Sequence, residues 1–363
     1  MLRSVLYFTK SLQRLKTNRI ISGYHSLKVK KEKLKEIKMK ITNKKILAAA
    51  LSLGLILAGC GKEEKPADDA AQTETAETTE TEETTETAEE PAETEEETDT
   101  ANAEDYDFTV VSREDGSGTR GAFIELVGLE EEVDGEKEDM TTQEAVVQNS
   151  TNGVMQTVSQ DAEAIGYISL GSLNGTVKAV KIEGVEATEE NIVNGSYKIS
   201  RPFNLGFKEA ELNDLAKDFL KFCISEDAQA LTLEEGYVPL QETEKYEAAG
   251  LSGKLTVAGS TSVTPLMEKM AEKYQELNPD ATIEIQSTGS SAGIEAVIDG
   301  AADIAMASRE LKDEEKEKLA VEVIATDGIA VVVNKESKVE DLTLEELKQI
   351  FKGELTNTSE LGK

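Results

Sequence analysis

Two loops rich in glycine, serine and threonine hold the residues best suited to bind a small anion. The first runs from Ser112 to Arg120 (SREDGSGTR) and the second from Gly259 to Pro265 (GSTSVTP). Each lies between a strand-like apolar run and a helix-like amphipathic run. Its backbone N–H groups and hydroxyls therefore point at one place in front of a helix N-terminus. Two such loops facing each other would surround an oxyanion.

A third loop of the same design, 287–293 (STGSSAG), follows a strand-like run at 282–286. Arg113 adds a planar fork suited to oxyanions, and we expect Asp115 to orient that fork. For any single loop, helix caps and turns are the more economical explanation, because Ser, Thr, Asp and Gly favour those positions. Three such loops together, one with an arginine, favour an anion-binding site.

Residues 1–59 are expected to be an N-terminal extension followed by a lipoprotein signal peptide. A lysine pair precedes an apolar run at 46–57, which is shorter than the roughly 20 residues that span a bilayer. The sequence Leu-Ala-Gly-Cys ending at Cys60 resembles the bacterial lipobox, whose cysteine receives lipid. This predicts a protein anchored to the outer face of the cell membrane; a core helix that ends in cysteine is the alternative. Translation starts at either Met1 or Met39.

Residues 60–104 are predicted to form an acidic, disordered tether. They are nearly all Glu, Thr, Ala and Asp, with too little apolar bulk to form a core. The whole chain has a formal net charge of -33. We therefore expect no binding to nucleic acid, and any small anion must be held by local donors.

Catalytic chemistry is poorly supported by the remaining residues. His25 is the only histidine and precedes the expected mature start, which excludes imidazole-based zinc sites and Ser-His or Cys-His catalysis. No Walker loop or nucleophile elbow occurs. Carboxylate runs such as 130–132 and 313–315 are typical of solvated faces, and Cys223 is predicted to be a buried structural residue. We expect a binding protein without metal, cofactor or catalytic residue, not an enzyme such as a phosphatase.

The part from Tyr106 to Lys363 has an α/β pattern. Strand-like runs occur at 108–111, 164–168, 255–258, 282–285, 303–307 and 329–333, and helix-like stretches occur at 121–127, 142–159, 212–224, 265–277, 292–298 and 344–351. Their alternation predicts mostly parallel sheets with helices on both faces.

Several segments together resemble the phosphate-binding proteins of bacterial ABC phosphate importers. They are 113–119, 259–265, 289–293, 302–309 and 327–331. The resemblance implies a two-lobed α/β fold like that of class II periplasmic binding proteins, with a ligand cleft between the lobes. It also implies a receptor that delivers phosphate to ABC permease subunits. A phosphate or oxyanion sensor, or a surface scaffold not coupled to transport, is the alternative.

In this framework, lobe II consists of 105–197 and 331–363, and lobe I of 198–330. The resemblance assigns phosphate binding to residues from both lobes: Thr261, Ser262 and Ser290 from one, and Arg113, Ser117, Gly118 and Thr119 from the other. Further candidates at the same site are Ser308, Arg309 and Asp327.

One departure from the family concerns the proton of hydrogen phosphate. Family members have an aspartate directly after the serine that corresponds to Ser308, and it accepts this proton. An acceptor there rejects sulfate, which has no proton to donate. Here the position is Arg309. We hypothesise that Asp327 substitutes for the missing aspartate, with Asp303 as the second choice.

The order of the segments also departs from the family. There, the part that matches 253–363 precedes the part that matches 106–240. Each part occurs once here, which predicts a circular permutation with 241–252 as the new linker. The rival interpretation is a truncated product that does not bind phosphate or that pairs its lobes between two chains.

Overall fold

The computed structural model describes residues 105–133 and 136–362, here called the body. The predicted signal peptide, the lipidated Cys60 and the acidic tether lie outside the described residues. In the body, no helix has the length and apolar character needed to cross a membrane.

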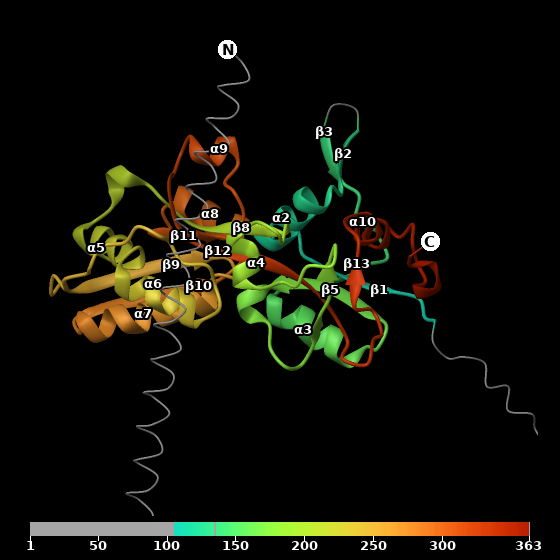
Figure 1. Cartoon of the computed structure of the whole chain (residues 1–363). Coiled ribbons are helices and arrows are strands. Elements are labelled where there is room, and N and C mark those ends of the chain that lie inside the picture. Colours follow the sequence, from blue (N-terminus) through green and yellow to red (C-terminus); the bar gives the residue numbers. More distant parts are fainter. Residues whose placement is uncertain (1–104, 134–135, 363) are drawn as a thin grey trace, which may run out of the picture. The chain divides into compact units, whose positions relative to one another are not determined.

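A mixed sheet of nine strands runs through the body (Figure 1). Its strands are β1 (Thr109–Arg113), β4 (Val146–Gln148), β5 (Ala164–Ser169), β6 (Lys178–Ala179), β8 (Ser200–Phe207), β9 (Gly253–Gly259), β10 (Ala281–Ser287), β11 (Ile304–Ala307) and β12 (Ala320–Val333). They pair in the order β10-β9-β11-β8-β12-β5-β1-β4, and β6 pairs with β12.

Strand β12 joins two halves of this sheet. Its residues 320–328 pair antiparallel with β8, and its residues 329–333 pair antiparallel with β5. The neighbours β9, β10 and β11 are parallel, as are β1, β4 and β5. The prediction of mostly parallel strands is therefore wrong for β8 and β12. The sequence pattern missed β8 because Pro202 and Gly206 are residues that argue against a central strand.

Helices cover both faces of the sheet, as predicted. In the first half, Val257 packs with α7 (Thr264–Leu277) and α5 (Asp214–Cys223), whereas the next residue, Ala258, packs with α8 (Ser290–Ile298). In the second half, Val110 packs with α2 (Gly118–Val127) and α10 (Leu344–Lys352), whereas Val111 packs with α3 (Thr151–Gln160). Adjacent strand residues point to opposite faces, so each pair separates two helical layers.

Other elements are short or lie outside this sheet. They are β2 (Glu130–Val133), β3 (Glu136–Asp139), β7 (Lys181–Ile182), β13 (Asp341–Leu342), α4 (Glu189–Val193), α6 (Glu226–Glu234) and α9 (Asp313–Lys316). Helix α3 is shorter than its predicted range of 142–159. The β-branched pair at 146–147 joins β4, and Ser150 begins the helix by accepting a hydrogen bond from the Gly153 amide at 3.1 Å.

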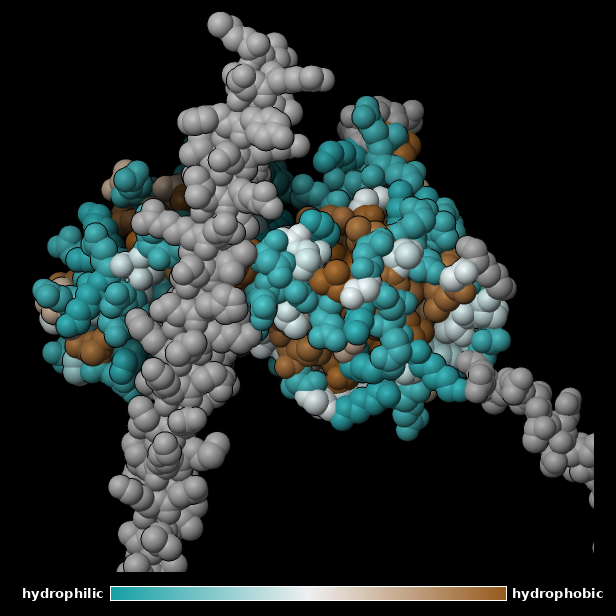
Figure 2. Space-filling view, viewed as in Figure 1, coloured by the Kyte–Doolittle hydropathy of each residue, from teal (hydrophilic) through white to brown (hydrophobic). Residues whose placement is uncertain are grey.

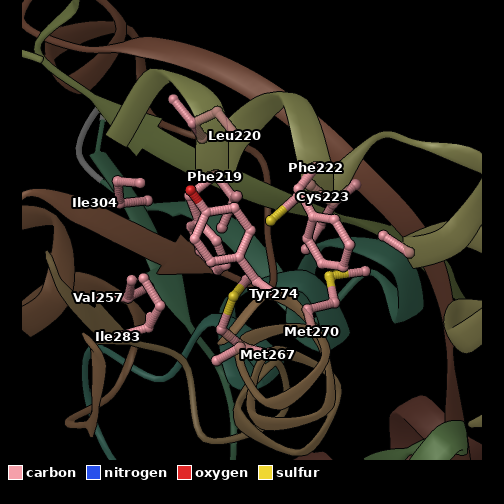
Figure 3. Packing of buried hydrophobic residues seen from close by; sticks show 14 of the residues in the cluster. Phe219, Leu220, Phe222, Cys223, Val257, Met267, Met270, Tyr274, Ile283 and Ile304 are labelled. Carbon is pink, nitrogen blue, oxygen red and sulfur yellow. The ribbon is translucent and has the colours of Figure 1, made fainter. Parts of the chain in front are cut away.

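An aromatic cluster fills the core beside α5 and α7 (Figure 3). The Tyr274 ring centroid lies 5.1 Å from that of Phe219 and 5.5 Å from that of Phe222. Cys223 packs in the same cluster and is fully buried, which confirms the prediction of a buried thiol. Burial raises the pKa of the Cys223 thiol, so the reactive thiolate is disfavoured.

The surface agrees in part with the predicted solvated faces. Figure 2 shows hydrophilic residues over most of the visible described surface, with smaller hydrophobic patches between them. Glu132, Asp313 and Glu314 are exposed. The prediction is wrong for Glu315, which is buried because its carboxylate binds an arginine of the site described below.

The two ends of the body run side by side. The amide of Phe108 donates to the carbonyl of Thr356 at 2.8 Å, and the amide of Thr358 donates to the carbonyl of Tyr106 at 2.9 Å. Residues near 106 and 357, about 250 positions apart in the sequence, therefore form one backbone ladder.

Candidate functional site

The predicted site residues gather where several strands end. Because β9 and β11 are parallel neighbours, Gly259 and Ser308, at their carboxyl ends, share one edge. Arg113 closes β1, and Ser169 closes its parallel neighbour β5. In open α/β sheets, ligands bind beyond the carboxyl ends of the strands.

Hydroxyl groups from separate loops contact one another at this place. Thr119 Oγ1 lies 2.8 Å from Ser262 Oγ, which also lies 3.1 Å from Thr151 Oγ1. Arg113 donates from Nη2 to Thr261 Oγ1 at 3.1 Å. The loops 112–120 and 259–265 are thus in direct contact. Thr151 was not predicted, although its place in the first turn of α3 puts its hydroxyl and amide where an anion would bind.

A second set of hydroxyls is contributed by three buried serines. Ser260 Oγ lies 2.8 Å from Ser308 Oγ, and the Ser308 amide donates to Ser290 Oγ at 3.2 Å. Ser290 is the first residue of α8. Gly118 opposes this set so closely that a Cβ atom added to it would lie 2.3 Å from Ser290 Oγ. The loop 287–293 therefore also belongs to the site.

The first turn of α2 supplies backbone donors to the site. Ser117 is its N-cap and is buried, and its Oγ accepts a hydrogen bond from the Arg120 amide at 3.3 Å. Gly118 and Thr119 follow as the first helical residues, whose amides have no partner within the helix. The partial positive charge of a helix N-terminus favours a bound anion here.

Arg113 is 1% exposed and is held by Glu114. Its Nε and Nη2 atoms donate to the two carboxylate oxygens of Glu114 at 2.8 and 2.9 Å. The prediction that Asp115 orients this arginine is wrong. Asp115 lies on the exposed turn and binds Arg120 Nη1 at 2.8 Å instead. Arg113 Nη1 is buried and has no hydrogen-bond partner among the described residues.

Arg309, at the position where the resemblance led us to expect an aspartate, forms an ion pair with a carboxylate. Nη1 and Nη2 donate to Glu315 at 2.7 and 2.8 Å, and Nη2 also donates to Ser291 Oγ at 3.1 Å. Burial opposes ionisation of Glu315, but the hydrogen bonds from Arg309 keep the pKa of this carboxyl below its ordinary value. The arginine charge is therefore compensated, and its side chain supports the first turn of α8.

Asp327 is fully buried in β12 and faces a second arginine. It accepts from Ser169 Oγ at 2.9 Å and from Arg201 Nη2 at 3.0 Å. Burial raises the pKa of Asp327 to about 6, although the charge of Arg201 acts in the opposite direction. Asp303 precedes β11, at the end of the strand opposite to Ser308, and accepts a hydrogen bond from the Thr256 amide. It therefore lies away from the site and is not the acceptor of the phosphate proton. Sequence reasoning missed Arg201 because it missed strand β8.

The body contains no group of three or more His, Cys, Asp or Glu side chains that could hold a metal ion. The site consists instead of hydroxyls, helix N-termini and buried arginines. Such groups hold an oxyanion by hydrogen bonds and charge.

Comparisons with known proteins agree with this chemistry. The model of the PBP superfamily domain matches residues 63–227 and 244–362. Phosphate-binding protein PstS 2 of Streptococcus agalactiae is 53% identical over 256 residues, which are 70% of this chain and 87% of the relative. Phosphate-binding protein PstS of Bacillus subtilis is 40% identical over 116 residues, 31% of this chain and 38% of the relative.

One solved structure matches most of the body. It is the crystal structure of a phosphate-binding protein of a phosphate ABC transporter from Streptococcus pneumoniae TIGR4, with 48% sequence identity and a TM-score of 0.58. The match covers 69% of this chain and 98% of that chain. From the family model and from the identity over 87% of the Streptococcus agalactiae relative and 98% of the Streptococcus pneumoniae structure, the chain belongs to the PBP superfamily and, within it, to the PstS family of phosphate-binding proteins.

Proposed function

We propose that this protein is a receptor that binds inorganic phosphate and delivers it to the permease subunits of an ABC importer. The observation that carries the proposal is the convergence of Arg113, Thr119 and Ser262 from loops that are remote in the sequence. Its PstS 2 relatives are named phosphate-binding proteins, which supports phosphate as the ligand.

Binding without catalysis explains the site. A micromolar complex needs about -8 kcal/mol. Hydrogen bonds that involve a charged partner contribute about 1.5–3 kcal/mol each, so Arg113 and several hydroxyls and amides reach this value after the cost of ordering. We therefore propose a solute-binding protein that carries out no reaction on its ligand.

The site is proposed to lie between two lobes. Strand β12 changes its partner from β8 to β5 between Gly328 and Ile329, close to the expected boundary at 330. This supports lobe I as residues 198–330 and lobe II as 105–197 with 331–363. Lipid on Cys60 is proposed to hold the protein at the extracytoplasmic face of the cell membrane, with 60–104 as a spacer.

The order of the two parts is proposed to be a native circular permutation. The matches to the PstS 2 proteins of Streptococcus agalactiae and Streptococcus pneumoniae cover 256 and 248 residues, about the length of the body, whereas the Bacillus subtilis relative matches over 116. This difference is expected if the PstS 2 relatives share the order seen here and the other relative has its halves exchanged. The backbone ladder between the two ends of the body supports the same proposal.

Calorimetry on the full chain, freed of bound phosphate, tests the function. We expect one phosphate bound per chain and arsenate bound similarly. Ser262→Ala should weaken phosphate binding about 10-fold, because it removes one hydroxyl from the site. Ser159→Ala is the matched control, since the hydroxyl of this half-buried serine donates only to the carbonyl of Gln156. A folded protein that binds none of these anions would refute the proposal.

A further inference from the structure

A second arginine, Arg201, is buried at the site, and the family resemblance assigns it no role. It lies near the start of β8 and is 3% exposed. Its Nη2 and Nε atoms donate to Asp327 at 3.0 and 3.3 Å, and its guanidinium carbon lies 5.6 Å from the centroid of the Phe203 ring. The carboxylate and the ring hold the guanidinium in one orientation.

The remaining nitrogen of this guanidinium has no partner. Arg201 Nη1 is buried, and no described residue accepts a hydrogen bond from it. Among the described residues, Arg113 has the one other buried guanidinium nitrogen in this state. Buried donors of folded proteins are almost always hydrogen-bonded, so two unpartnered arginine nitrogens indicate an acceptor that comes from outside the chain.

The strand register brings these two arginines to the same part of the sheet. Arg201 in β8 is the direct partner of Asp327 in β12. Asp327 accepts from Ser169 Oγ at 2.9 Å, and Ser169 ends β5. Strand β5 is the parallel neighbour of β1, which ends at Arg113. Both arginines therefore lie where the carboxyl ends of β1 and β5 meet the crossing strands β8 and β12.

The charges of the two arginines also act on each other. Burial and, to a smaller extent, the nearby positive charge of Arg113 lower the pKa of Arg201. Glu114 compensates one guanidinium and Asp327 the other. An anion bound between them would relieve the remaining repulsion and accept from both free nitrogens.

We propose that Arg201 is a second phosphate-binding arginine that donates from Nη1 to the same anion as Arg113, and that Asp327 is its positioning residue. The inference rests on the proposed function. It deepens that function by assigning the site to a doubly charged tetrahedral oxyanion, held by two planar guanidinium groups instead of one. Asp327 acts through Arg201 and makes no contact with the anion, because its two carboxylate oxygens already accept from Ser169 and Arg201. This role replaces the hypothesis that Asp327 accepts the phosphate proton.

Phosphate titration of the phosphate-free full chain by calorimetry tests this role, with Arg201→Gln and Arg201→Lys compared with the unmodified protein. We expect Arg201→Gln to weaken phosphate binding about 100-fold. Arg201→Lys keeps the charge and an ion pair with Asp327 but loses the planar fork. It should weaken binding about 10-fold while retaining most of the thermal stability. Affinities equal to that of the unmodified protein would overturn the inference.

If the variants fail to fold, a crystal structure of the unmodified protein with bound phosphate tests whether Arg201 contacts the anion. A phosphate oxygen within hydrogen-bonding distance of Arg201 Nη1 supports the inference. A phosphate that contacts Arg113 but not Arg201 overturns it and leaves the proposed function intact. An unmodified protein that binds no phosphate refutes the proposed function, and the inference fails with it.

Discussion

Glu114 binds the guanidinium of Arg113 through both carboxylate oxygens, at 2.8 and 2.9 Å, whereas its neighbour Asp115 binds Arg120 on the surface. The first carboxylate is partly buried and neutralises a fully buried arginine, but the second is almost completely exposed. Loss of the Glu114 carboxylate should therefore destabilise the folded protein much more than loss of the Asp115 carboxylate.

Glu114→Gln should lower the free energy of unfolding by about 2 kcal/mol. The substitution leaves the buried Arg113 charge without its carboxylate, and charge-assisted hydrogen bonds of this kind contribute about 1.5–3 kcal/mol. Asp115→Asn is the matched control and should change stability by less than about 0.5 kcal/mol, because exposed ion pairs contribute little. Urea unfolding measures both, and equal effects would contradict the assignment of Glu114 to Arg113.

Gly118→Ala should abolish detectable phosphate binding. A Cβ atom at this position would lie 2.3 Å from Ser290 Oγ and 2.8 Å from Ser308 Oγ, so the two loops would be forced apart. Gly121→Ala in the same helix is the control, since its Cβ would lie 3.4 Å from Arg309 Cδ, an ordinary contact. Calorimetric titration should show normal affinity for Gly121→Ala, and Gly118→Ala with the same affinity would show that close contact is dispensable.

The sequence alone predicted the loops of the site better than the contacts within it. Arg113, Thr119, Ser262 and Ser290 come together as expected, because glycine, serine and threonine between a strand and a helix define a local motif. Whether Glu114 or Asp115 faces Arg113 depends on the geometry of the turn. A turn has no repeating sequence pattern from which the direction of its side chains can be predicted.

Strand β8 was missed for a different reason. Its proline and glycine obscure the strand pattern, and its pairing with β11 and β12 joins segments about 100 or more residues apart. The missed strand contains Arg201. Glu315 was misassigned because a run of acidic residues on a short helix gives no indication that one of them faces a buried arginine.

The stability contributed by Asp327 should fall as the pH rises from about 4 to about 6. Burial raises the pKa of Asp327 from 3.8 to about 6, so in this range the folded protein keeps a proton that the unfolded chain has lost. Proton release on unfolding makes the unfolding free energy fall with pH, by about 1.4 kcal/mol per unit. Above pH 6 both states are ionised and the contribution becomes constant.

Urea unfolding of the unmodified protein and of Asp327→Asn at several pH values from 4 to 8 measures this contribution. The variant has no titrating group at position 327, so the difference between the two proteins isolates Asp327. This difference should decrease by about 3 kcal/mol up to pH 6 and then stay level. An increase with pH over the same range would mean that the ion pair with Arg201 outweighs burial.

Exchanging the two parts of the body should preserve both folding and phosphate binding. A chain that starts at Gly253, runs to Gly362, continues through a linker of about six Gly and Ser residues and then covers 105–252 has the order expected of other family members. Phe108 and Thr356 are already hydrogen-bonded at 2.8 Å, so joining these ends requires no rearrangement of the strands. The control is residues 105–362 in their natural order. Closing a short loop changes the chain entropy only slightly. The free energies of unfolding of the rearranged chain and of the control should therefore agree within about 1 kcal/mol, and both proteins should bind phosphate equally. A rearranged chain that folds but has lost phosphate affinity would show that the chain must stay continuous at 252–253 for the site to form, next to the segment that anchors Tyr246 to Asp218 and the Gly250 amide to Asn278.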